Sequence, residues 1–150
     1  MSDKIAPAVF VELLQETFDR GQLLTFTPTG TSMLPMLDGR EDRVTFSPKP
    51  DRLRKYDVAF YRRPKSGQLV LHRMVGFTRD GGYIFCGDNQ LALEYGITHD
   101  DVLALMTSFT HKGKERSVGS LRYCIYCRYI VWKKALRRFL SRIYHRLKHS

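Results

Sequence analysis

The nine residues LVLHRMVGF, at positions 69–77, set the pattern that most of the chain follows. Side chains alternate between the two faces of a β-strand. The segment therefore predicts one face with Val70, His72 and Met74, and another with Leu71, Arg73 and Val75. His72 shares its face with apolar residues, so the pattern alone indicates a half-buried histidine whose ring nitrogens are satisfied.

Similar strand-like segments lie on both sides of this one. They are LLTFTP (23–28), DRVTFSP (42–48), DVAFYRR (57–63) and YIFCGD (83–88), and turn-forming stretches such as PKSGQ and RDGG separate them. The order predicts a mostly antiparallel β meander. DDVLALMTSFT (100–110) would be a last strand entered by a turn at residues 98–101, although its leucine and methionine content leaves a helix open.

The two ends of the chain have a different character. The first 21 residues interleave acids with apolar residues, which predicts an amphipathic helix and no targeting signal. With 150 residues and 43% hydrophobic content, one core is expected. We therefore expect a mostly β (α+β) protein made of an N-terminal helix (1–21), a β domain (22–111) and a basic linker with an amphipathic helical tail (112–150).

The net charge of +10 comes from this tail. Residues 1–111 carry 13 Lys and Arg against 14 Asp and Glu, whereas residues 112–150 carry 12 against Glu115 alone. From Tyr129 onward, apolar residues recur in steps of three and four, which describes one helix face. That face holds Tyr129, Trp132, Leu136, Phe139, Leu140, Ile143 and Leu147; the basic residues between are Lys133, Lys134, Arg137, Arg138, Arg142 and Arg146.

A helix of this kind suits an anionic membrane surface. Trp132, Lys133, Lys134, Arg137, Arg138, Phe139 and Arg142 are the predicted membrane or partner contacts. Two other interpretations stay open: the apolar face packs on the β domain, or the basic face binds RNA or DNA, although no recognised nucleic-acid module accompanies it. The longest apolar stretch, YCIYCRYIVW, has ten residues and contains Arg128, too few to span a bilayer.

The cysteines indicate the compartment. Cys86, Cys124 and Cys127 form an odd set without a secretory signal, which favours reduced thiols. The single C-x-x-C suits two small apolar residues on a helix better than a zinc or redox site. The predicted location is cytoplasmic, peripheral at the inner face of the membrane.

The stretch TPTGTSMLPML (27–37) contains the candidate nucleophile. Ser32 lies at a strand-to-turn junction between Gly30 and Pro35. Serine is a weak nucleophile until a neighbouring base takes its proton. His72 suits that task because histidine is mostly unprotonated at neutral pH and can return the proton to a leaving amine.

The motifs GTSMLPML, YDVAFYRR, VLHRMV and CGDNQ, in this order over residues 22–106, resemble the type I signal peptidase and LexA-like superfamily of serine peptidases, in its histidine-type branch. The resemblance implies that superfamily's β fold, with Ser32 as nucleophile and His72 as general base. The Ser32 amide would help to bind the oxyanion, to which Gly30 can add no side chain, and Met33 and Pro35 would shape the loop and substrate groove.

The acid that orients His72 stays open between two residues. In histidine-type relatives an Asp follows the G-D-N turn; here Glu94 matches by position, and Asp88 stands in the turn itself, where it could instead shape the backbone. Arg73, on the opposite strand face, would pair with an acid or be solvated, and has no assigned catalytic step.

The implied activity is cleavage of a peptide or precursor leader at the cytoplasmic side of a membrane, without a metal or organic cofactor. Only 31 residues precede Ser32, which is too few for the DNA-binding domain of an autocleaving LexA-like repressor, and the membrane helix usual in signal peptidases is missing. The competing hypothesis is a non-catalytic peptide-binding or adaptor module that docks through its tail.

Overall fold

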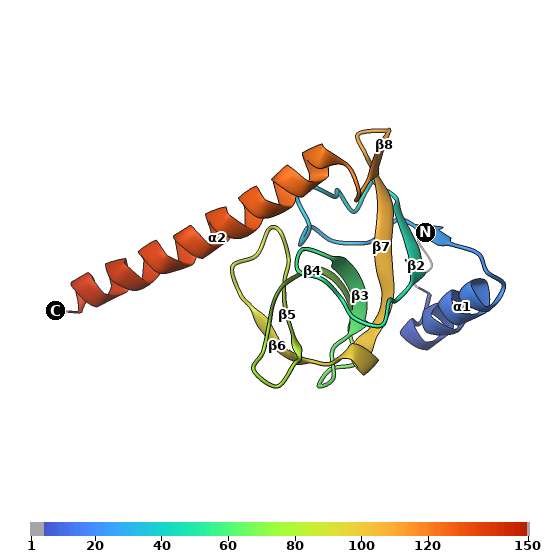
Figure 1. The fold of residues 1–150 in the computed structure, drawn as a ribbon, viewed down its shortest axis with the longest axis horizontal. Helices are drawn as coiled ribbons and strands as arrows, with labels where there is room; N and C mark the ends of the chain where they lie inside the picture. Colours follow the sequence, from blue (N-terminus) through green and yellow to red (C-terminus); the bar gives the residue numbers. More distant parts are fainter. Residues whose placement is uncertain (1–4, 150) are drawn as a thin grey trace.

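The computed structural model describes residues 5–149 and has, within them, an N-terminal helix, an eight-stranded antiparallel sheet and a long C-terminal helix (Figure 1). This confirms the α+β class. The elements are α1 (Pro7–Asp19), β1 (Leu24–Phe26), β2 (Val44–Pro48), β3 (Val58–Arg62), β4 (Leu69–Phe77), β5 (Tyr83–Cys86), β6 (Glu94–Ile97), η1 (His99–Asp101), β7 (Val102–His111), β8 (Lys114–Ser117) and α2 (Leu121–Lys148).

The sheet departs from a plain meander at β7. The strand order is β1-β2-β7-β3-β4-β5-β6, with β8 paired to β7. Strands β3, β4 and β5 form a meander as predicted, β6 extends it by one strand, and β7 then returns to lie between β2 and β3. The segment that the sequence left open between strand and helix is thus a central strand, with Ala104 and Met106 buried in one hydrophobic cluster and Val102 buried in the other.

Two strands were not predicted. β6 is a short strand beyond the G-D-N turn, and β8 lies inside the segment predicted as linker and helical tail, so that prediction was wrong for residues 114–117. Lys112 and Gly113 both have positive φ, 50° and 74°, and connect His111 to its partner Lys114. A two-residue turn with this backbone favours a tight hairpin.

The sheet curves, and hydrophobic clusters pack on both of its sides. Register shifts interrupt the pairing of β2 with β7, β3 with β7, β4 with β5, and β5 with β6, and such bulges bend strands. One cluster packs Phe46, Phe60 and Met106 with Leu14 of α1; the other holds residues such as Tyr61, Met74 and Phe85. Because both of its faces meet a cluster, β4 is buried from Val70 to Met74.

Helix α2 begins at Leu121, ahead of the apolar pattern that starts at Tyr129. The Ser120 hydroxyl accepts a hydrogen bond from the Tyr123 N–H at 3.3 Å and caps the helix. The buried residues of α2 are Tyr123, Cys127, Ile130 and Lys134, so its first half packs on the sheet, and the second half projects beyond it (Figure 1). Across residues 5–149, helices that combine the length and the apolar character needed to cross a bilayer do not occur.

The face of α2 that packs is not the predicted apolar face. Trp132, Phe139 and Leu140 are 62%, 58% and 54% exposed. The interpretation that this face packs on the β domain was therefore wrong: α2 uses a second face, on its other side. Lys134 was predicted on the basic surface, but it belongs to the packed face and is buried.

Candidate active site

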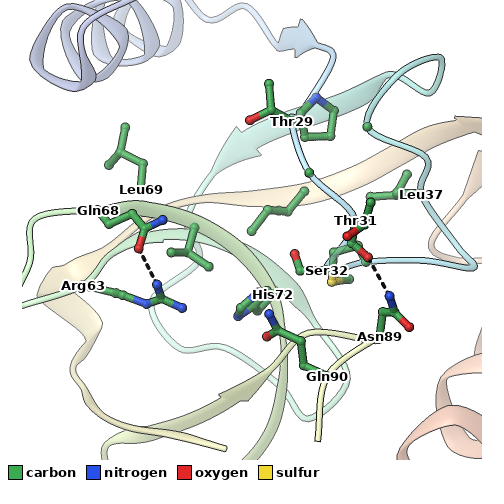
Figure 2. A pocket seen from close by; sticks show the side chains of 16 residues that line it. Thr29, Thr31, Ser32, Leu37, Arg63, Gln68, Leu69, His72, Asn89 and Gln90 are labelled. Atoms are coloured by element: carbon green, nitrogen blue, oxygen red, sulfur yellow. Dashed lines mark hydrogen bonds between the residues drawn. The ribbon is translucent and has the colours of Figure 1, made fainter. Parts of the chain in front are cut away.

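Ser32 lies in the long connection between β1 and β2, where glycine and buried methionine fix the backbone. Gly30 has a φ of 97°, which favours glycine. The backbone of Gly39 lies so close to that of Gly30 that a Cβ on Gly39 would be 2.4 Å from the Gly30 carbonyl oxygen. Met33 is 4% exposed and belongs to the core, whereas Pro35 is exposed. The loop is therefore anchored beside Ser32, which stays partly accessible in a pocket of about 520 Å³ (Figure 2).

His72 reaches the same pocket from β4. Its side chain is 2% exposed, and it lines the pocket together with Ser32, Leu69 and Gln90 (Figure 2). A Cβ placed on Gly87 would lie 2.7 Å from the Ser32 carbonyl oxygen and 3.0 Å from His72 Nε2. Both residues therefore flank one point, with Nε2 close to the Ser32 loop. The described residues include no hydrogen bond from Ser32 Oγ to His72, and catalytic pairs are often longer without substrate.

The other ring nitrogen of His72 faces an acid. His72 Nδ1 lies 3.0 Å from Glu94 Oε1 and 3.3 Å from the Tyr61 hydroxyl oxygen. Tyr61 donates to Glu94 Oε2 at 3.0 Å, and Arg63 donates to the same oxygen at 2.8 Å and to Oε1 as well. A proton on Nδ1 would be held by Glu94, which leaves the lone pair of Nε2 toward the pocket.

Burial and charge set the protonation of this group. Burial lowers the pKa of His72, and this effect exceeds the opposing attraction of Glu94. Burial would raise the pKa of Glu94, but the hydrogen bonds from Arg63 and Tyr61 lower it below its usual value. A neutral imidazole beside a carboxylate is the pair that a serine needs as its general base.

The structure places Asp88 away from His72. Its carboxylate makes two 2.8 Å hydrogen bonds with the Arg73 guanidinium and accepts one from the Tyr126 hydroxyl at 2.9 Å. Arg73 is fully buried and also donates to the Tyr56 carbonyl and the Tyr123 hydroxyl. Asp88 was a candidate to orient His72; this contact belongs to Glu94, and Asp88 instead joins β4 to α2.

The turn after β5 contacts the loop that holds Ser32. The Asn89 N–H donates to the Ser32 carbonyl at 2.8 Å, and its side-chain amide donates to the Thr31 carbonyl at 3.2 Å (Figure 2). Gly87, which has no Cβ, lets the turn lie close to the Ser32 carbonyl oxygen and His72 Nε2. Sequence reasoning identified the G-D-N turn but not these roles, which depend on how the turn meets a loop more than 50 residues earlier.

Lys134 also reaches this turn, from α2. Its side chain is 5% exposed, and its ammonium donates to the Gly87 carbonyl and lies 2.9 Å from Cys86 Sγ. The other predicted surface residues of the helix, Trp132, Lys133, Arg137, Phe139 and Arg142, are exposed, and Arg138 is half-buried beside the Leu91 carbonyl. Cys124 and Cys127 lie on α2 as expected of a helical pair, and Arg73 donates to Cys127 Sγ.

The site therefore offers proton transfer through side chains. Within residues 5–149, groups of three or more His, Cys, Asp or Glu side chains that could hold a metal ion were not found. Comparisons with protein-family models, with curated proteins and with solved structures found no match.

Proposed function

We propose that this protein is a serine endopeptidase, similar in fold and chemistry to signal peptidases, that cleaves a peptide or precursor leader at a cytoplasmic membrane surface. The observation that carries the proposal is the placement of Ser32 and His72 Nε2 around one point, with Glu94 on the opposite nitrogen of the ring. The order of nucleophile, base and acid follows the logic of a Ser-His-acid triad.

In the proposed reaction His72 Nε2 takes the Ser32 Oγ proton while Oγ bonds to the scissile carbonyl carbon. The electron pair of the C=O bond moves to oxygen and returns when the C–N bond breaks, and Nε2 gives its proton to the leaving amine. Water then loses a proton to Nε2 and attacks the acyl-enzyme, which releases the carboxylic acid and restores the Ser32 hydroxyl.

The oxyanion would be stabilised by backbone donors. Among residues 5–149, the Ser32 N–H takes part in no hydrogen bond, so it is free to donate to a developing negative charge. Gly30 contributes no side chain. The Asn89 side-chain amide supports this proposal because it donates to the Thr31 carbonyl, which lies in the same peptide plane as the Ser32 N–H.

The outer face of α2 supports the membrane location. Its exposed apolar residues include Trp132 and Phe139, exposed basic side chains such as Lys133 and Arg142 flank them, and residues 116–150 contain no acid. Each cation near an anionic leaflet contributes about 1 kcal/mol. We expect Trp132→Ala with Phe139→Ala to weaken binding to anionic vesicles in a co-sedimentation assay while binding stays salt-sensitive; unchanged binding would contradict an apolar contribution.

The activity is tested by mass spectrometry of a diverse peptide library, incubated with anionic vesicles and wild type, Ser32→Ala or Ser141→Ala. Ser141 is exposed on the projecting part of α2, so its variant controls for loss of a hydroxyl. We expect cuts with wild type and Ser141→Ala and none with Ser32→Ala. Equal cleavage by all three would contradict Ser32 as nucleophile, and cleavage by none would favour the peptide-binding module.

A further inference from the structure

Lys134 is a buried cation without an acidic partner. It is 5% exposed, and within residues 5–149 it forms no ion pair with a carboxylate. Burial of an ammonium group is unfavourable unless its protons are well bonded, and an apolar side chain could fill the same space without that penalty. The contacts of its nitrogen therefore indicate the role of this side chain.

Those groups belong to the turn that supports the site. The Lys134 ammonium donates to the Gly87 carbonyl and to Cys86 Sγ, the latter at 2.9 Å. Gly87 is the residue whose absent Cβ leaves space for the Ser32 carbonyl and His72 Nε2. A single residue of the turn thus contacts α2 on one side and the nucleophile and base on the other.

Helix α2 contacts three consecutive residues of this turn. Besides Cys86 and Gly87, it holds Asp88, whose carboxylate accepts from the Tyr126 hydroxyl at 2.9 Å. In Figure 1 the helix runs along the side of the sheet where β5 and β6 lie. The turn is therefore fixed between the helix and the Ser32 loop, rather than by its own hairpin alone.

We propose that Lys134 is a positioning residue of the active site, which holds residues 86–90 against Ser32 and His72 and presents a positive charge to the imidazole. This inference rests on the proposed peptidase function. The charged and titratable groups that face His72 are Glu94 on β6, Tyr61 and Arg63 at the end of β3, and Lys134 on α2. Removal of the Lys134 charge removes one of the two cations that oppose imidazolium formation.

The test compares Lys134→Met with Lys133→Met in the full chain. Lys133 is exposed on the same helix, so its variant loses the same charge without touching the turn. For Lys134→Met we expect amide exchange of the Asn89 N–H to accelerate by about tenfold, because the turn opens more often. The His72 pKa, followed by NMR of its ring protons, should rise, and turnover should fall by about 10- to 100-fold with a smaller change in KM.

Lys134→Gln separates the two effects and serves if the methionine variant does not fold. Glutamine can still donate to the Gly87 carbonyl but carries no charge, so we expect the His72 pKa to rise with a smaller change in Asn89 exchange. An unchanged His72 pKa and unchanged Asn89 exchange in folded variants would overturn the inference. If both respond as expected while wild type cleaves no peptide, the peptidase proposal fails and the positioning of the turn stands.

Discussion

Asp88→Ala tests whether this acid serves the fold or the chemistry. The substitution leaves the Arg73 guanidinium, which is fully buried, without its carboxylate, and it removes the acceptor of the Tyr126 hydroxyl. Loss of one partner of a buried ion pair typically destabilises a protein by about 3–5 kcal/mol. For a chain of this size, that loss lowers the melting temperature by roughly 6–20 °C.

The assay is thermal and urea unfolding followed by circular dichroism, with Asp51→Ala as the control. Asp51 is exposed and makes no described side-chain contact, so its loss should change the unfolding free energy by less than about 0.5 kcal/mol. Adding Arg73→Met to Asp88→Ala should recover part of the stability, because the uncompensated cation is then gone.

The decisive comparison is between stability and activity. At a temperature where Asp88→Ala remains folded, its pH profile of turnover should keep the shape of the wild type, because Asp88 makes no contact with His72. A variant as stable as wild type but without turnover would refute the structural role and return Asp88 to the catalytic group.

Three further outcomes are expected. Glu94→Gln should lower turnover by about 10³- to 10⁴-fold, since a neutral amide no longer stabilises the imidazolium; Glu41→Gln, at an exposed position, is the control, and equal rates would contradict the triad. Gly87→Ala should abolish turnover because the new Cβ would lie 2.7 Å from the Ser32 carbonyl oxygen, whereas Gly119→Ala, whose Cβ meets Ser117 Oγ at 3.7 Å, should be active; an active Gly87→Ala would count against this site. The acidic limb of kcat/KM should lie below the ordinary histidine value of 6.5, because burial lowers the pKa of His72. The measurement is kcat/KM in buffers from acidic to neutral pH, and an acidic limb above 6.5 would contradict a buried base. The folded chain binds the His72 proton less tightly than the unfolded chain, so the free energy of unfolding should also fall as the pH drops from 6.5 through the lower pKa of His72 in the folded chain.

Local patterns predicted the strands well where alternation and turn residues agreed. β4 runs over the residues expected, because nine strand-forming residues lie between two clear turns. β8 was missed because its four polar residues give no apolar alternation. The sequence feature that could have indicated this hairpin strand is the Lys112–Gly113 turn before it. β6 was missed for a similar reason: its four residues include an acid and a glycine.

The contacts within the site could not be predicted from local sequence patterns, because they join segments that are distant in the sequence. Glu94 reaches His72 because β6 pairs with β5 at the register that places Glu94 opposite Phe85. Tyr61 of β3 and Arg63, directly after this strand, contact the acid from more than 30 residues earlier in the chain. Lys134 was assigned to the surface because it falls between the residues of the predicted apolar face, and only the packing of α2 shows which side of the helix faces inward.

The place of β7 in the sheet has a consequence for the order of folding. Ser32 belongs to the half that contains β1 and β2, and His72 belongs to the meander of β3 to β6. Within the sheet, β7 alone links these halves, by pairing with β2 and β3. A growing chain therefore cannot close this sheet until residues 102–111 have emerged, and contacts so distant in sequence form slowly. Under the proposed function, the complete site would therefore form only after β7 has joined the two halves of the sheet.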